Sequence, residues 1–314
     1  LINDASTDRK IFTLLDNLSS DKLNFKVIHN SENLGFTKTV NKGINLCSDK
    51  NVIILNSDAR VTPRWFEGMT HAASTSDDIA TVTAMSDRAG AFSAPNIGND
   101  NVLPEGVSEE SYAVAFRRYS MGIYPTVPTG NGFCMFIQRK CLNEIGGLDV
   151  EAFPRGYGEE NDFCMRARKN GWRNIIDDRT YVFHDRSKSF GGEKSELIKV
   201  GRKVIDERYP DYSKAIQFYS KSYSMHLIRY RARIAMNSVV KTDFRPRVMY
   251  VVSTQTGGTP QTNRDLMMSL YDTVEPWLLH CNAQVMTLYK IGAEEDEVIE
   301  QHHLSEIVEP YTHK

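Results

Sequence analysis

Residues 153–166 read FPRGYGEENDFCMR. The proline and the glycines predict a loop, and the acids after them (Glu159, Glu160 and Asp162) fall in the first turn of a predicted helix that ends at Asn170. Acids at a helix start often do no more than complement the helix dipole. Whether they do more here depends on polar residues elsewhere in the chain.

Short apolar runs alternate with segments of helical spacing, which predicts an α/β fold. Residues 52–55 form a continuous apolar run, as in a central parallel strand. Further strands are expected at 25–28, 79–84, 133–137, 174–176 and 181–183. Helices are expected at 37–47, 108–119, 139–145 and 194–209.

Polar residues follow two of these strands. In open α/β sheets, ligands bind at the carboxyl ends of strands. Asn3 and Asp4, after a strand that ends at residue 2, and Asn56 and Asp58, after 52–55, are therefore candidate nucleotide contacts. For the first pair, a plain helix N-cap is the alternative.

Three further features have a functional and a structural interpretation. Lys38, beside the loop at the start of helix 37–47, could contact a phosphate or be solvated. Gly130, Asn131 and Gly132 precede a strand, where the glycines permit close approach of a ligand or make a bend. Residues 86–128 are expected to form a variable insertion that contributes to a substrate cleft.

The composition limits the class of protein. The chain has 314 residues, of which 40% are hydrophobic and 25% charged, as in a globular protein. Its net charge of −2 does not favour nucleic-acid binding. The five cysteines contain no C-x-x-C pair, which favours a reducing, cytoplasmic location. The chain begins without Met at what reads as a strand end, so we expect an N-terminal truncation within a domain.

The C-terminal third divides into two parts. Residues 211–245 are predicted to be a basic helical linker, either solvated between domains or lying on an anionic membrane surface. Residues 246–314 read as the opening of a second, Rossmann-like α/β unit: a strand at 248–252, a Gly-rich loop at 256–260, a helix at 263–271 and a strand at 283–288.

Several motifs in order resemble the family 2 glycosyltransferases of the GT-A fold, in the rhamnosyltransferase-like branch. The matching segments are 3–8, 33–36 with 41–43, 55–58, 146–149, 158–163 with Arg166, and His184. The resemblance implies a GT-A nucleotide-sugar-binding domain over 1–210 with a mixed, mostly parallel central sheet. Residues 246–314 are similar to the start of a GT-B glycosyltransferase.

The resemblance also implies roles for the site residues. Asn3 and Asp4 match positions near the nucleotide base, and residues 56–58 match the D-x-D metal motif with only its last carboxylate kept. Glu159 and Glu160 match the acidic pair whose second member is the base. His184 matches a histidine that helps to hold the metal.

These roles meet the chemical demands of sugar transfer. A divalent cation, Mn²⁺ or Mg²⁺, would neutralise the leaving diphosphate, with Asp58 and His184 as ligands. Glu160 is the predicted general base and Asp162 the second choice, because the two point about 200° apart on a helix. Glu159 is assigned with Gly130, Asn131 and Gly132 to the acceptor cleft. Direct displacement with one base predicts inversion at the anomeric carbon.

The predicted function is transfer of a hexosyl or deoxyhexosyl group from a nucleotide-diphosphate sugar to a saccharide or lipid-linked saccharide, in polysaccharide or glycan synthesis. The predicted location is the cytoplasm, with peripheral contact at the inner face of the membrane through 211–241 as an alternative. Rival interpretations are a sugar-phosphate nucleotidyltransferase and a non-catalytic nucleotide- or carbohydrate-binding module.

Overall fold

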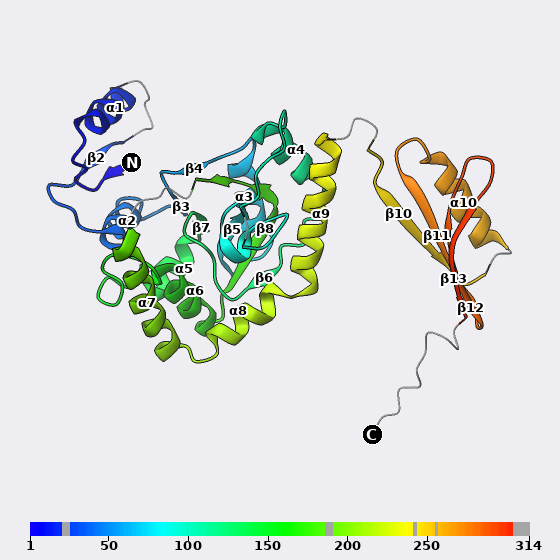
Figure 1. Ribbon diagram of the computed structural model, residues 1–314. Helices are drawn as coiled ribbons and strands as arrows, with labels where there is room; N and C mark the ends of the chain where they lie inside the picture. Colours follow the sequence, from blue (N-terminus) through cyan, green and yellow to red (C-terminus); the bar gives the residue numbers. More distant parts are fainter. Residues whose placement is uncertain (21–25, 99, 186–190, 241–243, 255–256, 304–314) are drawn as a thin grey trace. The chain divides into compact units, whose positions relative to one another are not determined.

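The computed structural model describes residues 1–20, 26–98, 100–185, 191–240, 244–254 and 257–303 (Figure 1). The chain forms two compact units, Leu1–Val239 and Val240–Lys314, and each is described by itself.

A five-stranded mixed sheet lies at the centre of the first unit. Its strand order is β3-β7-β5-β8-β6. Of the four described pairings within this sheet, β5–β8 is parallel and the other three are antiparallel. The predicted α/β class and mixed sheet are confirmed, but the sheet is not mostly parallel in its pairings. The strands are β3 (Val52–Leu55), β5 (Ile79–Met85), β6 (Thr126–Val127), β7 (Cys134–Ile137) and β8 (Arg173–Tyr181).

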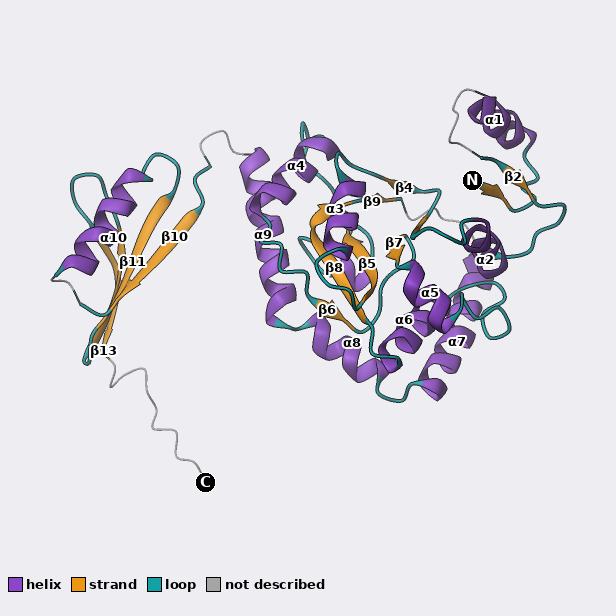
Figure 2. Ribbon diagram, turned by 180° about the vertical axis from the view of Figure 1, so that it is seen from behind, coloured by secondary structure: helices purple, strands orange, loops and turns teal. Residues whose placement is uncertain are grey.

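Helices cover both faces of this sheet (Figure 2). All seven residues of β5 are buried, because apolar side chains pack on each side of it. On one face lie α3 (Trp65–Ala73), α4 (Glu109–Tyr119) and α9 (Tyr223–Val240); on the other lie α2 (Phe36–Leu46), α5 (Arg139–Ile145) and α6 (Glu159–Lys169).

The remaining elements of the first unit are small. Two parallel strands form one separate sheet, and two antiparallel strands form another. These strands are β1 (Ile2–Asn3) with β2 (Ile28–His29), and β4 (Ala59–Arg60) with β9 (Phe183–His184). The helical elements are α1 (Arg9–Ser20), η1 (Gly90–Phe92), α7 (Gly191–Arg208) and α8 (Tyr212–Ser220).

Helices α8 and α9 belong to the first unit, where the sequence predicted a linker at 211–245. The reason is the inner face of α9. Its side chains Met225, Ile228, Ala232 and Ala235 are buried in the core between the sheet and α4. Basic residues on the outer face suggested a linker, but the apolar face completes the core, so the first unit extends past the predicted boundary at 210 to Val239.

The second unit contains a four-stranded sheet in the order β10-β11-β12-β13. Of the three described pairings within this sheet, β10–β11 is parallel and the other two are antiparallel. The sequence predicted the opening strand and helix but missed β11. After β11 the short segment 282–284 reverses the chain, and a parallel crossover would need about a dozen residues. The predicted Rossmann-like, GT-B-type unit is therefore not confirmed. The elements are β10 (Arg247–Val252), α10 (Gly258–Ser269), β11 (Glu275–Cys281), β12 (Val285–Lys290) and β13 (Glu297–His303).

None of the described helices has the length and apolar character that crossing a membrane requires.

Candidate active site

The carboxyl ends of three strands lie at one edge of the central sheet. Strands β3, β5 and β8 run in the same direction, since β7 is antiparallel to both β3 and β5, and β5 is parallel to β8. Beyond this edge, β4 follows β3 and β9 follows β8, and these two strands pair with Ala59 opposite His184. The pairing brings Asp58 and His184 together from distant parts of the sequence.

The two predicted metal ligands face each other. His184 Nε2 lies 3.2 Å from Asp58 Oδ1 and 3.5 Å from Asn56 Nδ2. The other ring nitrogen, Nδ1, lies 3.2 Å from the carbonyl oxygen of Arg88. A carbonyl can only accept, so Nδ1 donates to it in this arrangement, and Nε2 is the ring nitrogen that faces the Asp58 carboxylate.

This geometry fits a small divalent cation. Two acceptors that face each other at 3.2 Å are stabilised by a positive charge between them, from a metal ion or a proton on Nε2. Within the described residues, no group of three or more His, Cys, Asp or Glu side chains could hold a metal. Mg²⁺ is commonly bound by one or two carboxylates plus substrate phosphates, so a two-ligand site is compatible with a cation that arrives with a diphosphate.

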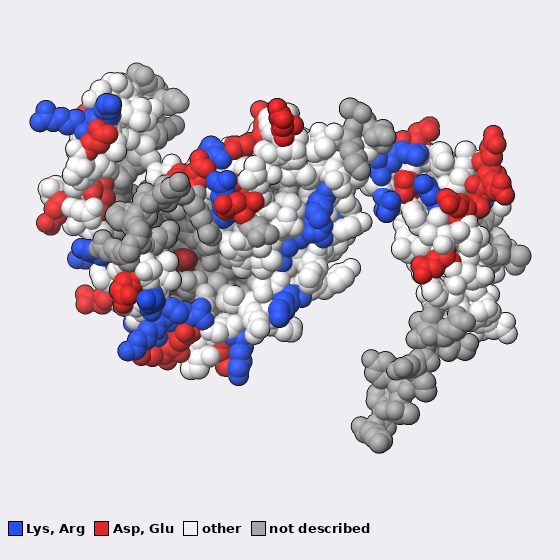
Figure 3. Space-filling view, in the orientation of Figure 1, with Lys and Arg blue, Asp and Glu red and all other residues white. Residues whose placement is uncertain are grey.

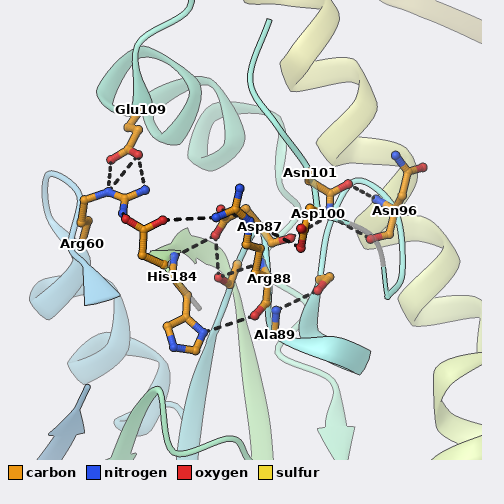
Figure 4. A network of polar contacts seen from close by, with 12 residues as sticks. Arg60, Asp87, Arg88, Ala89, Asn96, Asp100, Asn101, Glu109 and His184 are labelled. Carbon is orange, nitrogen blue, oxygen red and sulfur yellow. Dashed lines mark hydrogen bonds and ion pairs between the residues drawn. The ribbon is translucent and has the colours of Figure 1, made fainter. Parts of the chain in front are cut away.

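The surroundings of His184 fix its orientation. Its backbone N–H donates to Asp87 Oδ1 at 2.8 Å (Figure 4). Its ring stacks on Phe133 with centroids 5.2 Å apart. Asp87 is almost fully buried. Backbone, ring plane and Nδ1 are thus each held by a separate contact, as is usual for histidines that bind metals.

Arginines surround the outer side of this site. Arg60 donates to Glu109, and Asp185 bridges Arg60 and Arg88 (Figure 4). The sequence interpretation missed Asp87, Arg88 and Asp185. Their positions could have indicated them, because Asp87 and Arg88 come just after the carboxyl end of β5. The sequence predicts a variable insertion for this segment.

The acidic helix α6 begins as predicted at Glu159. Its N-cap, Gly158, has φ of 139°, and a Cβ there would lie 2.5 Å from the Phe153 ring, so only glycine fits. Burial raises the pKa of Glu159 well above its ordinary value, and the charge of Glu160 adds to this. Burial also raises the pKa of Glu160, whose Oε2 is buried without a hydrogen-bond partner.

Asp162, the second choice for the base, is fully committed to the structure. Its Oδ2 accepts from Arg166 Nε at 2.8 Å. Its Oδ1 accepts from Arg208 Nη1 at 2.8 Å and from Tyr209 OH at 2.9 Å. The side chain is completely buried, so Asp162 anchors the first turn of α6 to the end of α7.

The segment Asn131–Phe133 lies between the acidic pair and the metal pair. A Cβ on Gly132 would lie 4.0 Å from Glu160 Cβ, while Phe133 stacks on His184. The backbone N–H of Asn56 donates to the Phe133 carbonyl at 2.9 Å. Glu160, His184 and Asn56 therefore border the same short segment.

The glycine of this loop that packs most tightly is Gly130. A Cβ there would lie 2.7 Å from both Met135 Sδ and Thr83 Oγ1. The bend is therefore required by packing, which is the structural alternative that the sequence left open.

The predicted nucleotide contacts have partners within the chain. Asp4 Oδ1 accepts from Asn30 and from the Leu34 N–H, and its Oδ2 accepts from the Gly35 N–H. Asn3 bonds His29 and the Ser6 N–H. These bonds link β1 to the loop 30–35.

Lys38 lies in a different place from the metal pair. It lines a shallow pocket of about 480 Å³ on α2 with Asn41, Lys42, Asn45, Leu46 and Val150. The phosphate contact of Lys38 stays a prediction.

Known proteins match parts of this chain. Residues 1–146 match the family model described as glycosyl transferase family 2. The chain is similar to that family over this segment, which includes Asn56 and Asp58 but ends before Glu160 and His184. Uncharacterized proteins of Mycobacterium bovis and Mycobacterium tuberculosis are 32% identical over 98 residues, 30% of this chain and 35% of each relative's length.

Two solved structures have a related chain course. A GalNAc-T7 structure with UDP, GalNAc and Mn²⁺ is 15% identical, covers 76% of this chain and 50% of its own, and has a TM-score of 0.48. The mannosyltransferase PcManGT of Pyrobaculum calidifontis, in complex with GDP-Man and Mn²⁺, is 14% identical. The match covers 85% of this chain and 70% of PcManGT, with a TM-score of 0.44.

Proposed function

We propose that this chain is an inverting glycosyltransferase that uses a nucleotide-diphosphate sugar as donor. The acceptor is a hydroxyl of a saccharide or lipid-linked saccharide in polysaccharide or glycan synthesis, and the transferred group is a hexose or deoxyhexose. The observation that supports this best is the Asp58–His184 pair at the carboxyl edge of the sheet, in a chain whose first 146 residues match family 2.

Asp58 and His184 would hold Mn²⁺ or Mg²⁺. When bound, the cation would neutralise charge on the leaving diphosphate as a Lewis acid. Asp58 offers a hard oxygen ligand, and the contact of Nδ1 with the Arg88 carbonyl leaves Nε2 as the His184 nitrogen that would coordinate the cation. Asn56 lies beside them and would orient the donor through its amide.

Glu160 would be the general base. Its carboxylate would take the proton of the acceptor hydroxyl as that oxygen attacks the anomeric carbon, and the bond from this carbon to the diphosphate oxygen would break. A base in such a position contributes about 10²–10⁴-fold to the rate. Burial raises the pKa of Glu160, which makes its carboxylate more basic, and Oε2 has a free acceptor site for the hydroxyl.

The other predicted site residues have supporting roles in this proposal. Glu159, Asn131 and Gly132 would line the acceptor side, because they adjoin Glu160. Asp4 would contribute to nucleotide binding by holding the loop 30–35. The role of Asp162 is to position α6, not to act as a base.

The surface of α8 and α9 favours contact with an anionic membrane. Residues 212–240 contain no Asp or Glu. At the α8–α9 corner, Phe218 and Tyr223 are each 81% exposed, with the exposed Lys221 between them in sequence. The surface over α9 is white with blue patches in Figure 3. Exposed aromatic and basic side chains together are typical of interfacial helices, and vesicle binding tests this part of the proposal.

The test of the activity uses a panel of nucleotide sugars with Mn²⁺ and saccharide acceptors. We expect release of nucleoside diphosphate with transfer of the sugar, and none with Glu160→Gln. Glu151→Gln is the matched control, because Glu151 is exposed in the loop before α6. Binding without release would favour the non-catalytic module. Release of pyrophosphate from a nucleoside triphosphate and a sugar phosphate would favour the nucleotidyltransferase.

A further inference from the structure

The loop of residues 86–94 is closed on itself behind the candidate metal site. The Ser86 N–H donates to the Phe92 carbonyl at 3.1 Å, and the Ala94 N–H donates to the Ser86 carbonyl at 3.0 Å. Inside the loop, the Ala89 N–H donates to Ser93 Oγ at 2.8 Å (Figure 4). Residues 86–94 therefore form one turn that is closed by its own hydrogen bonds.

One side of this turn orients His184. The Arg88 carbonyl accepts from Nδ1 at 3.2 Å, and Asp87 Oδ1 accepts from the His184 backbone N–H at 2.8 Å. The first contact favours a proton on Nδ1 and holds the ring in the orientation that turns Nε2 toward Asp58. A displaced Arg88 carbonyl would free the ring to take the other tautomer or to rotate.

The opposite side of the turn is held by a buried arginine from α9. Arg229 is 6% exposed. It donates from Nη2 to the Ala91 carbonyl at 2.8 Å, from Nε to the Ser93 carbonyl at 3.2 Å, and from Nη1 to the Ser220 carbonyl at 3.1 Å. Within the described residues, its hydrogen-bond partners are backbone carbonyls and no carboxylate pairs with it.

A buried guanidinium in this environment needs a reason, because removing a charge from water is unfavourable. Its planar fork donates to three carbonyls from three different nitrogens, an arrangement that a lysine, with all three N–H donors on one nitrogen, does not reproduce. Two of these carbonyls belong to the 86–94 turn, and the third belongs to the end of α8. Arg229 thus fixes the turn relative to the α8–α9 corner.

We propose that Arg229 is a positioning residue for His184. It acts through the 86–94 turn, which presents the Arg88 carbonyl to Nδ1 and so keeps Nε2 ready for a cation. This inference rests on the proposed function, since it concerns the same metal site. It assigns to α9, a helix outside the family match, a part in metal binding.

The test compares Arg229→Lys with the control Arg233→Lys. Arg233 lies one turn along the same helix and donates at 3.3 Å to the Pro95 carbonyl, outside the turn. The first measurement is the ¹⁵N NMR spectrum of the His184 ring in the metal-free protein, assigned with His184→Gln. The second is the Mn²⁺ dissociation constant. Circular dichroism checks that each variant is folded.

We expect wild type and Arg233→Lys to show one His184 tautomer, protonated at Nδ1. Arg229→Lys is expected to show a mixture and to bind Mn²⁺ about 3- to 10-fold more weakly, less than the roughly 10- to 100-fold typical for loss of a direct partner. Ser93→Ala removes the acceptor of the Ala89 N–H within the turn. We expect it to show the same mixture of tautomers and the same weaker Mn²⁺ binding. If Arg229→Lys does not fold, the Ser93→Ala result tests the proposal.

The inference is overturned if the folded variants keep the wild-type tautomer and Mn²⁺ affinity. Failure of the proposed metal site would look different, because the wild-type protein would then bind no Mn²⁺ while the tautomer shift in the variants would still appear.

Discussion

His184 Nε2 lies 3.2 Å from Asp58 Oδ1, although the two residues belong to distant segments of the chain. The antiparallel pairing of β4 with β9 produces this contact, and the Asp185 N–H adds a bond to the Asp58 carbonyl at 2.9 Å. The backbone pairing therefore places the two proposed ligands side by side.

Asp58→Asn is expected to weaken Mn²⁺ binding by more than about tenfold, because a neutral amide replaces the only carboxylate of the pair. Isothermal titration with Mn²⁺ and a nucleoside diphosphate measures this. Asp77→Asn is the control, since it makes the same change at an exposed position. Equal affinities in the two variants would remove Asp58 from the site.

The pH dependence of transfer should reflect Glu160. Burial raises its pKa above the ordinary 4.5, and the base must be ionised. Transfer should therefore fall as pH decreases through the raised pKa, at a higher pH than for an exposed glutamate. A profile of kcat/KM against pH tests this, and activity that persists down to pH about 4.5 would contradict it.

Glu160→Gln should also stabilise the protein near neutral pH. A carboxyl whose pKa is raised in the folded state binds more protons folded than unfolded, so stability falls as pH rises through the window between the two values. Glutamine does not ionise, so the variant lacks this loss of stability at higher pH. Thermal unfolding should show a higher Tm for the variant at pH about 8 and a smaller difference at low pH. A lower Tm at both pH values would contradict the raised pKa of Glu160.

Asp162→Ala should destabilise the fold by about 3 kcal/mol, because it leaves Arg166 and Arg208 without a buried partner. Urea unfolding measures the change in free energy. Asp206→Ala is the control, since its ion pair with Arg202 is on the surface and should matter little. An Asp162 variant with wild-type stability but no transfer would instead favour a role in catalysis.

Phe218→Ser with Tyr223→Ser should weaken binding to phosphatidylcholine vesicles that contain phosphatidylserine by about tenfold, because two exposed aromatic side chains no longer insert. Co-sedimentation measures it. Phe66→Ser, an exposed phenylalanine on α3, is the control. No binding by the wild type, or equal binding by both variants, would contradict the membrane contact.

The sequence predicted local features well. Apolar patterning and the positions of glycines predict where α5 and α6 begin. They also predict the strands β3 and β7. The convergence of Asp58 with His184 was predicted through the resemblance, and the structure places the two side chains in contact. Glu160 is linked to this pair through an intervening segment. Glu160 adjoins Gly132, and the next residue, Phe133, stacks on His184.

Other features could not be read from local patterns. The partners of Asp4 and Asp162 come from distant segments, so their acids looked free in the sequence. Arg229 read as one basic residue among several in 211–245, because its burial depends on the fold of the 86–94 turn. β12 pairs antiparallel with β11 because a short turn joins the two strands. The Rossmann-like prediction did not include this turn.

Paramagnetic broadening by Mn²⁺ in the presence of a nucleoside diphosphate tests most directly whether residues 58, 160 and 184 border one cation site, with Mg²⁺ as the diamagnetic control. We predict that backbone resonances of 56–58, 87–89, 131–133, 159–160 and 184–185 broaden together. Broadening centred elsewhere, or broadening at 58 and 184 that leaves 159–160 sharp, would contradict the account.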